Sequence, residues 1–442
     1  MTVPTDAQSR ATRRRVLIAG NCGNFVEWFD FAIYGYLAPV LAGLFFPAGD
    51  RTTQLLSVFA VFAVSFAARP IGAMVFGPLG DRIGRRRTLA IVVLLMSGAT
   101  CAIGLLPTYD SIGVAAPLLL VLCRIAQGFS AGGEYAGASI FLVEHAPAHR
   151  RGFYASFIPA SSYAAFLVAV ALVTGLTVAL PETAMQSWGW RVPFLLAGLF
   201  GVVALFIRSR VEDTPAFKAI EATKTVARRP LRDTLRTQWK PLLVIFGIVV
   251  TDSVYYYMIW TYMPTYLSEE VGMEYSDALL ANSLALTVLL VVVPLAGVLS
   301  DRIGRKPMLL GAFLGFAVLT VPAFWVAGLG QIGLAIVGQL IFLVPAFLLD
   351  TPMSAALAES FPAEVRYSSG ALAYNIGYIV GGAAPFVSTL LIASTGNVLA
   401  PAFYIVALAV GSFFVVAFGF TETYRRRLSP ADPEPATDGP AG

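Results

Sequence analysis

Two acidic side chains lie in an apolar stretch near the start of the chain, in the segment GNFVEWFDF at 23–31. Glu27 and Asp30 are three residues apart, and no Lys or Arg occurs from Val16 to Pro47. A carboxylate at the centre of a membrane helix costs about 2.5 to 3.5 kcal/mol, so these acids should face protein or water rather than lipid. Their spacing predicts that both lie on one face of a helix.

Further ionisable residues lie deep in other apolar stretches: Arg69, Arg124, Glu134, Asp252 and Asp350. The deep set therefore has five acids against two arginines. Desolvation and like-charge neighbours oppose ionisation of all five acids. One or more should be protonated during part of a working cycle, as proton coupling requires. Acid–arginine pairs can also simply join helices, and Arg69 and Glu134 are the best candidates for that structural role.

The elements that must position these residues are membrane helices. The chain of 442 residues is 57% hydrophobic and 13% charged, whereas soluble proteins are roughly 25% charged. Apolar windows of about 20 residues predict an all-α membrane protein with twelve transmembrane helices. The windows are 16–45, 55–78, 88–107, 114–143, 153–179, 192–209, 241–268, 278–299, 307–328, 332–358, 369–394 and 398–421.

The basic residues predict how these windows cross the membrane. Most of the 30 Lys and Arg residues fall in the tails and in alternate loops, which the positive-inside rule assigns to the cytoplasm. Both termini should therefore be cytoplasmic, and the net charge of +4 reflects this bias rather than nucleic-acid binding. Asp252 would then lie in the cytoplasmic half of its window, where water could reach it. The first window is too long for the apolar core of a signal peptide.

Neither cysteine nor histidine chemistry is expected. The three Cys residues lie inside windows without CxxC spacing, and we interpret them as small buried side chains. His145 and His149 share one basic loop with only Glu144 beside them. That set is too small for a metal site, so no metal and no cofactor is predicted.

An internal duplication divides the chain. GDRIGRRRT begins at Gly80 and SDRIGRKPM begins at Ser300, each between the second and third windows of a six-window half. The repeat predicts a cytoplasmic tail at 1–15, a half at 16–209, a cytoplasmic linker at 210–240, a second half at 241–421 and a disordered tail at 422–442. In each copy the Asp at a helix end can meet cationic side chains and a helix N-terminus, which would latch the cytoplasmic side closed. The latch residues are Asp81, Arg82, Arg85, Arg86, Asp301, Arg302 and Arg305. Arginines that only mark topology are the alternative.

Several segments carry a family resemblance. DRIGRR resembles the signature loop of the major facilitator superfamily. GNFVEWFDFAIYGYLAP, RIAQGFSAGGEYAGASIFLVEHAPAHRRGFYASF, WGWRVPFLLAG and EDTPAF are similar to its metabolite:proton symporter family. TYMPTYLS at 261–268 and FPAEVRYSSGALAYNIGYIVGGAAP at 361–385 look most like the proline and betaine symporters of that family.

This resemblance implies a multi-pass protein of a bacterial cytoplasmic (inner) membrane with two parallel-repeat halves of six helices. It also implies that the first, fourth, seventh and tenth helices line a central cavity, and all deep charges except Arg69 fall in those windows. Arg124 lies in an RxxQG segment of the kind that ties an arginine to proton transfer in the superfamily. The predicted proton-coupling site is therefore Glu27, Asp30 and Arg124.

The seventh window is rich in aromatic residues. Helical spacing places Tyr256, Trp260 and Met263 on one face and Tyr255, Tyr262 and Tyr266 on another. Aromatic faces bind quaternary ammonium groups, whereas an aromatic belt at the outer interface explains Tyr262 and Tyr266 equally well. Core packing is as good an explanation for Tyr256 and Trp260 as cavity lining. The predicted substrate-cavity residues are Tyr256, Trp260, Glu134, Asp252, Asp350 and Arg69.

Small residues elsewhere predict close helix contacts, in SAGGEYAGAS at 130–139 and GYIVGGAAP at 377–385.

Several functions remain open at this level. The first is a proton-coupled symporter that imports a zwitterion such as proline or glycine betaine. The second is a proton symporter of a carboxylate such as 2-oxoglutarate, citrate or shikimate. A di- or trianion should need several deep cations, and only Arg69 and Arg124 are deep enough, which favours the zwitterion, although one arginine and a helix N-terminus can hold a carboxylate. A channel lacks a filter motif and an enzyme lacks a catalytic motif. A non-transporting membrane sensor is a remote third function. We expect a monomer with a small-molecule substrate, protons and the lipid bilayer as its partners.

The C-terminal tail departs from the osmoprotectant subgroup. After Thr423 it reads YRRRLSPADPEPATDGPAG, which is short, Pro-rich and without heptads. A coiled coil of the kind that some osmosensory members carry is therefore not expected.

Overall fold

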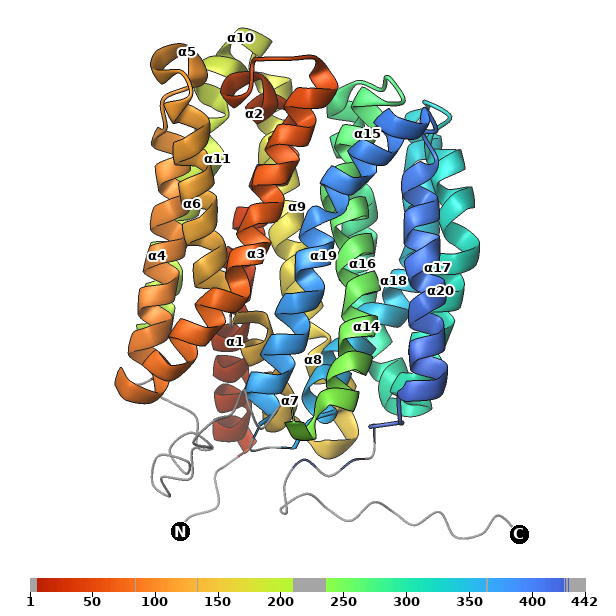
Figure 1. Ribbon diagram of the computed structural model, residues 1–442. Coiled ribbons are helices and arrows are strands. Elements are labelled where there is room, and N and C mark those ends of the chain that lie inside the picture. The colour runs from red at the N-terminus through yellow and green to blue at the C-terminus, as the bar shows by residue number, and fades with distance from the viewer. Residues whose placement is uncertain are drawn as a thin grey trace, which may run out of the picture.

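The computed structural model describes residues 6–83, 85–132, 134–209, 236–362 and 365–424, together with 426 and 428. Their helices stand side by side in one bundle (Figure 1). The helices before residue 210 are α1 (Asp6–Tyr36), α2 (Ala38–Phe45), α3 (Arg51–Ile83), α4 (Arg85–Leu105), α5 (Tyr109–Ile112), α6 (Ala115–Ala131), α7 (Glu134–His145), α8 (Arg151–Ala155), α9 (Phe157–Ala179), α10 (Glu182–Ala184) and α11 (Arg191–Ser209).

The second half of the bundle begins after residue 235. Its helices are α14 (Trp239–Tyr257), the π-helical turn η3 (Met258–Tyr262), α15 (Met263–Glu269), α16 (Tyr275–Ile303), α17 (Arg305–Ala327), α18 (Ile332–Glu359), α19 (Arg366–Thr395) and α20 (Ala400–Gly419). Two seams join the halves, because α3 packs along α19 and α9 packs along α16.

The predicted apolar windows are confirmed as helices. Ten stretches are long and apolar enough to cross a membrane, the bent pair Asn21–Tyr36 and Ala38–Phe45 can form one more span, and Ala90–Leu105 is a shorter apolar helix. Together they occupy all twelve predicted windows. The first pair bends by 63°, because Pro39 lies in the first turn of α2, where its ring clashes with the preceding turn and it has no N–H to donate.

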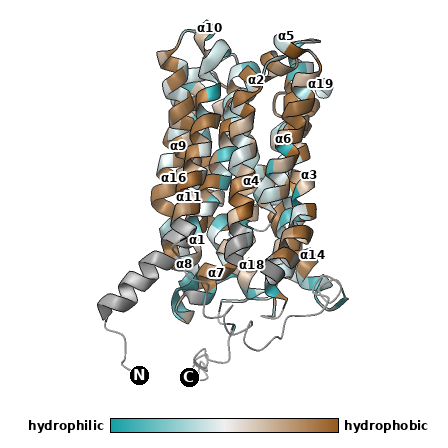
Figure 2. Ribbon diagram, turned by 90° about the vertical axis from the view of Figure 1, so that its left-hand side faces the viewer, coloured by the Kyte–Doolittle hydropathy of each residue, from teal (hydrophilic) through white to brown (hydrophobic). Residues whose placement is uncertain are grey.

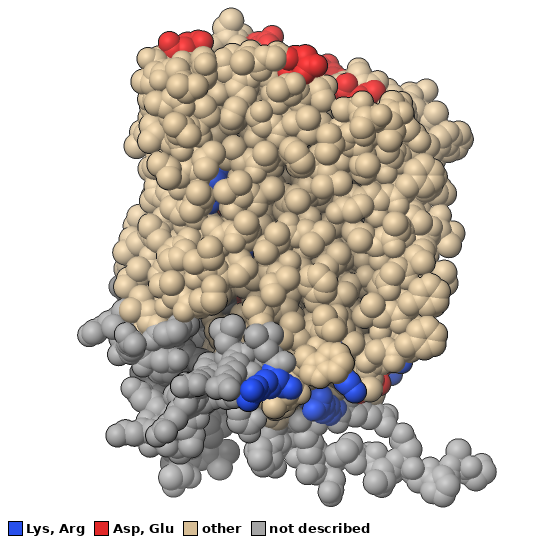
Figure 3. All heavy atoms as spheres, viewed as in Figure 1, with Lys and Arg blue, Asp and Glu red and all other residues tan. Residues whose placement is uncertain are grey.

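The outside of the bundle suits a bilayer. Large apolar side chains such as Leu118, Val291 and Phe414 are exposed there, and apolar residues cover much of the length of the helices (Figure 2). On the face shown in Figure 3, acidic side chains gather at the upper end and basic side chains at the lower end, and the broad band between them is almost entirely uncharged. A soluble protein does not leave an apolar band of this kind uncovered.

Glycines let the helices approach closely, as the small-residue segments predicted. A Cβ at Gly132 would lie 2.2 Å from the carbonyl oxygen of Arg69, and one at Gly382 would lie 2.1 Å from the ring of Phe66. Gly381 is equally crowded by Ser253, with 2.4 Å to its side chain. The first two contacts bring α3 against α6 and α19, near the deep charged residues of α1 and α3, and the third brings α19 against α14.

The predicted tails need two corrections. Helix α1 begins at Asp6, so part of the segment 1–15 that was predicted as a tail continues the first helix. The predicted disorder at 422–442 is wrong for Glu422–Tyr424, because Glu422 accepts hydrogen bonds from the backbone N–H groups of Arg305 and Lys306. Residues 1–5, most of the linker (210–235) and 429–442 lie outside the described residues, so the division into tails, linker and halves stays a prediction there.

Candidate functional site

Glu27 and Arg69 form an ion pair inside the first half of the bundle. Arg69 donates from Nη2 to a carboxylate oxygen of Glu27, and both residues are almost completely buried. The guanidinium carbon of Arg69 lies 5.5 Å from the ring centroids of Phe31 and Phe66 and 5.8 Å from that of Tyr378. The sequence predicted Arg124 as the counter-charge and Arg69 as a helix staple. The long side chain of Arg69 reaches from α3 to Glu27 on α1 and takes the pairing instead.

Asp30 faces a different neighbour. Its carboxylate accepts a hydrogen bond of 2.7 Å from the hydroxyl of Thr100 on α4. Glu27 and Asp30, although only three residues apart, therefore contact different neighbouring helices. Three residues turn an α-helix through 300°, and the 60° that remains directs one side chain toward α3 and the other toward α4.

A chain of polar side chains connects Asp30 to Arg124. Gln127 donates to Thr100, and Arg124 donates to Gln127 over 2.8 Å and to Ser65 over 3.0 Å. The guanidinium carbon of Arg124 lies 4.3 Å from the ring centroid of Tyr34. Among the described residues Arg124 makes no ion pair with an acid. The predicted acid and base are therefore linked through two neutral side chains rather than directly.

A second pair of acids lies in the other half. Asp350 on α18 accepts hydrogen bonds from the hydroxyl groups of Tyr163 on α9 and Tyr255 on α14. Asp252 on α14 accepts one from Tyr378 over 3.2 Å, and it lines the same small pocket as Asp350. Asp252 is 1% exposed and Asp350 is 3% exposed. The sequence predicted that water could reach Asp252, but in this conformation its side chain is buried.

The acid pair forms one wall of a small space, the central pocket, between the two halves. Trp28, Tyr135, Pro159 and Ser162 line it from the first half, and Asp252, Tyr256, Asp350 and Tyr378 line it from the second. It leaves 10 Å³ for the centre of a water molecule, which is room for about one water. In this conformation the central pocket is too small to hold an organic substrate.

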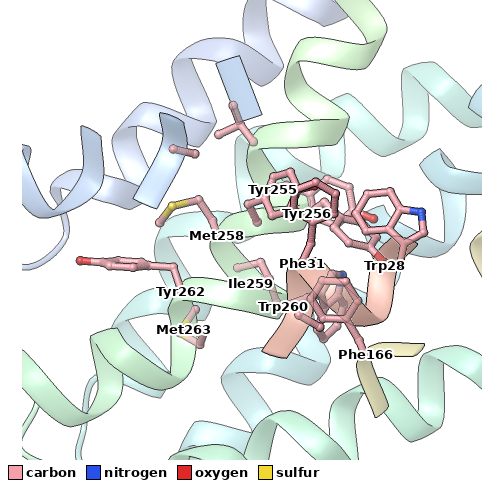
Figure 4. Close-up of a cluster of buried hydrophobic side chains, with 14 of the residues drawn as sticks. Trp28, Phe31, Phe166, Tyr255, Tyr256, Met258, Ile259, Trp260, Tyr262 and Met263 are labelled. Atoms are coloured by element: carbon pink, nitrogen blue, oxygen red, sulfur yellow. The ribbon is translucent and has the colours of Figure 1, made fainter. Parts of the chain in front are cut away.

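Aromatic rings surround Trp28 beside this pocket. Its ring centroid lies 4.8 Å from that of Tyr256, 5.8 Å from that of Tyr378 and 6.1 Å from that of Tyr135. Figure 4 shows Trp28 and Tyr256 side by side in this buried cluster. The hydroxyl of Tyr256 is buried and has no hydrogen-bond partner in the described structure. The pocket therefore combines aromatic faces, two carboxyl groups and one unused hydroxyl.

The other aromatic predictions divide. Trp260 is buried behind the pocket and packs edge-on against Tyr163 at 5.9 Å, without lining the pocket itself. Tyr262 and Tyr266 are 1% and 0% exposed, so they do not form an interfacial belt. Helical spacing predicted that Tyr255 shares a face with Tyr262 and Tyr266. The π-helical turn η3 follows Tyr257, and its i→i+5 hydrogen bonds shift the helical register, so the spacing of a regular α-helix does not apply across it.

Two other predicted cavity residues lie away from the pocket lining. Glu134 begins α7 and is 7% exposed. Arg69 is separated from the pocket by the ring of Tyr378.

The sequence did not identify Trp28, Tyr135, Tyr163 or Tyr378 as functional. A tyrosine in the middle of a membrane window needs a partner for its hydroxyl, and this need was the signal available for all three tyrosines.

The loop end that carries the second DRIGR copy holds the halves together. Asp301 on α16 accepts hydrogen bonds from the backbone N–H groups of Gly152 over 2.7 Å and Phe153 over 2.9 Å, both in α8 of the first half. It also accepts one from Arg305 over 3.0 Å. Gly297 permits this approach, because a Cβ there would lie 2.6 Å from the carbonyl oxygen of Gly152.

Arg305 extends this contact to the end of α18 and to the C-terminal segment. Its guanidinium pairs with Glu359 at 3.0 Å, and both side chains are fully buried. The hydroxyl of Thr423 donates to the same carboxylate over 2.7 Å. Arg151 of the first half donates to the backbone carbonyl of Arg426 over 2.8 Å. The C-terminal segment therefore crosses from one half to the other at this end.

The remaining predicted latch residues are less informative. Arg302 is exposed. Asp81, Arg82, Arg85 and Arg86 belong to α3 and α4, but their side chains lie outside what the structure describes. A cross-half ion pair that the sequence missed joins Glu144 to Arg366 at 2.6 Å.

The opposite end is closed by weaker contacts. Arg51 at the start of α3 pairs with Glu269 at the end of α15 at 2.5 Å, with side chains 43% and 20% exposed. Deeper in, Tyr36 donates to Asn282 over 2.9 Å. Both ends of the central pocket are therefore shut in this conformation.

In the loop before α3, hydrogen bonds from the side chain and backbone of Thr53 hold the pKa of Asp50 below its ordinary value.

Comparison with known proteins gives the family. The model of the major facilitator superfamily matches residues 21–385. A proline/betaine transporter of Escherichia coli (strain K12) is 38% identical over 429 residues, which cover 95% of this chain and 86% of that protein. The ectoine/proline transporter ProP of Corynebacterium glutamicum is 38% identical over 421 residues, which cover 92% of this chain and 83% of that protein.

Solved structures agree on the fold. The proton:xylose symporter XylE bound to 6-bromo-6-deoxy-D-glucose superposes with a TM-score of 0.76 at 18% identity, covering 95% of this chain and 98% of that one. The human organic anion transporter MFSD10 gives a TM-score of 0.64 at 15% identity, covering 91% and 99%. These likenesses support two six-helix halves. The chain is a multi-pass membrane transporter of the major facilitator superfamily, related to the proline/betaine transporters.

Proposed function

We propose that the protein is a proton-coupled symporter that imports a small zwitterionic metabolite such as proline or glycine betaine by alternating access. The observation that carries this proposal is the central pocket, which residues of both halves line with aromatic rings and two carboxyl groups. A pocket at the interface of two halves is reached from one side of the membrane at a time when the halves rock against each other. The printed names of the relatives, which include proline, betaine and ectoine, support this substrate class.

The charges favour a zwitterion over a di- or tricarboxylate. In the described residues no Lys or Arg lines the central pocket. Arg69 is the nearest deep cation, since its guanidinium carbon lies 5.8 Å from the ring of Tyr378, which is itself part of the lining. A zwitterion has one carboxylate, with which this one arginine can pair. The further carboxylates of a di- or tricarboxylate would be repelled by Asp252 and Asp350.

The ion pair between Glu27 and Arg69 supplies a route for coupling. While Glu27 is ionised it neutralises Arg69. A proton on Glu27 removes that negative charge, and Arg69 then becomes available to the carboxylate of a substrate. Proton and substrate would thus bind together, as symport requires. Asp30 and Arg124, linked through Thr100 and Gln127, form the second part of the proposed proton site.

The two closed ends supply the gates. We assign the end with the DRIGR loops to the cytoplasm, because basic side chains gather there (Figure 3). Both termini would then be cytoplasmic, in a bacterial inner membrane. We also propose that a monomer transports, without a cofactor, nucleic-acid contact or catalytic activity.

Uptake into proteoliposomes with an imposed pH gradient tests this function. Labelled proline and glycine betaine should accumulate, with excess citrate and 2-oxoglutarate competing poorly. Preferential competition by the carboxylates would replace the zwitterion with the alternative substrate class. Absence of uptake of every compound by a folded protein would favour a sensor.

Two variants test the coupling residues in the same vesicles. A neutral amide cannot carry the proton, so Glu27→Gln and Asp30→Asn should abolish accumulation driven by the pH gradient. Exchange of labelled for unlabelled substrate needs no net proton movement and should survive. Variants of both residues that still concentrate substrate would show that these acids only join helices.

A further inference from the structure

The acid pair of the central pocket is not used by the proton site proposed above. Asp252 and Asp350 line the same small pocket and are nearly inaccessible to solvent. Two ionised carboxylates in one dry pocket repel each other strongly. Both deep arginines are engaged elsewhere, Arg69 with Glu27 and Arg124 with Gln127 and Ser65. At least one of the two carboxyl groups should therefore keep a proton, and no described Lys or Arg lines the pocket to balance the negative charge of the other.

The hydroxyl groups around the pair orient Asp350 without neutralising it. Tyr163 and Tyr255 each donate one hydrogen bond to Asp350, from α9 and α14 respectively. A tyrosine hydroxyl has a single proton to donate, so both donors are committed. Donors of this kind stabilise an ionised carboxylate. They also fix it against the pocket.

The remaining walls suit an organic cation. Trp28, Tyr256 and Tyr378 contribute ring surfaces, with Tyr256 centred 4.8 Å from Trp28. Aromatic faces attract quaternary and secondary ammonium groups, and the attraction increases when water is excluded. Tyr256 is 4% exposed, and its buried hydroxyl has no hydrogen-bond partner in the described structure. It is an unused polar group in the lining of the pocket.

We propose that Asp252 and Asp350, with the rings of Trp28, Tyr256 and Tyr378, form the subsite for the cationic nitrogen of the substrate. This rests on the proposed function and extends it, because the subsite recognises positive charge and needs no carboxylate on the ligand. An organic monocation such as choline should therefore bind there. The pocket holds about one water when closed, so the ligand enters only after the halves separate.

Equilibrium binding to the purified full-length protein in detergent, measured by calorimetry, tests the subsite. The probes are glycine betaine, its carbon isostere 3,3-dimethylbutanoate, which lacks the positive charge at the same shape, and choline, which lacks the carboxylate. The wild-type protein should prefer glycine betaine to the isostere by at least about tenfold and should bind choline. Asp350→Asn and Asp252→Asn should each lower the preference for the charged nitrogen by about tenfold or more.

Asp277→Asn is the matched control, because the same change is made at the outer end of α16. It should leave the preference unchanged. Equal affinity of the wild-type protein for glycine betaine and its isostere would overturn the subsite without any variant, so the test does not depend on the variants folding. Asn variants that fold and keep the wild-type preference would overturn it as well.

The result is separable from the proposed function. Uptake of glycine betaine driven by a pH gradient, combined with no preference for positive charge, would retain the symporter and remove the subsite. Charge-selective binding without uptake would retain the subsite and remove the symporter.

Discussion

The contact between Asp301 and α8 makes a quantitative prediction about opening at the DRIGR end. Asp301→Asn keeps one oxygen acceptor but loses the charge and one of the two acceptors that meet Gly152 and Phe153 at 2.7 and 2.9 Å. A hydrogen bond to a charged group contributes about 1.5 to 3 kcal/mol. The substitution should therefore weaken the closed state by about 2 to 3 kcal/mol, which shifts the open population by about 30- to 150-fold. Folding should survive, because Arg305 keeps its pairing with Glu359.

A buried cysteine can report this shift. Ala155 is fully buried in a small cluster with Ala355 and Ala358 of the other half, so Ala155→Cys, in a background with the native cysteines replaced by serine, reacts with a maleimide only when this end opens. When opening is fast, the rate of modification follows the open population. The rate should rise by the same factor in Asp301→Asn. It should stay unchanged in Asp277→Asn, at the other end of the same helix. A rise below about threefold in folded protein would refute the reasoning, as would full reactivity before any change to Asp301.

Three further substitutions separate the remaining contacts. Glu359→Gln leaves Arg305 buried without its main partner, so the free energy of unfolding, followed by thermal melting in detergent, should fall by about 3 to 5 kcal/mol; an unchanged melting temperature would contradict the buried pairing. Arg51→Ala removes an exposed ion pair worth about 0.2 to 1 kcal/mol, so labelling of the outer side should change less than about fivefold; a change as large as that of Asp301→Asn would mean that the outer gate has been underestimated. Tyr256→Ala should weaken binding of glycine betaine by about tenfold more than binding of its carbon isostere. Trp260→Ala should weaken binding of both ligands equally, because its indole does not line the pocket. If Trp260→Ala lowers the preference for glycine betaine as much as Tyr256→Ala does, both rings contact the ligand.

Hydropathy was enough to predict the helices but not their partners. A membrane window must satisfy its backbone within itself and face lipid, so each of the twelve windows is marked by its own residues. Which cation pairs with Glu27 depends on how α3 is rotated against its neighbouring helices, and contacts such as that of Gly132 with the backbone of Arg69 fix this rotation. The two residues of such a contact lie far apart in the sequence. The pairing with Arg69 was therefore missed, although both residues had been identified.

Two local features explain the other differences. The π-helical turn η3 changes the helical register after Tyr257, and no residue type marks such a turn in the sequence. Tyr163 and Tyr135 look like ordinary apolar core residues until their hydroxyl partners on other helices are known. Conversely, Asp252, Asp350 and Tyr256 were predicted in the cavity because acids are costly in lipid and aromatic runs are conspicuous. The assignment of a role to any of them stays a prediction.

The position of Trp28 has an optical consequence. Its indole is covered by Tyr135 and Phe166 of its own half and by Tyr256, Tyr257 and Tyr378 of the other. Separation of the halves strips away the rings of one side and admits water, and indole emission shifts to longer wavelength in water. Of the six tryptophans, Trp188, Trp239 and Trp325 are already exposed, and Trp190 and Trp260 are buried away from the pocket lining. The protein thus contains its own fluorescent indicator of the transport cycle, readable without any attached dye.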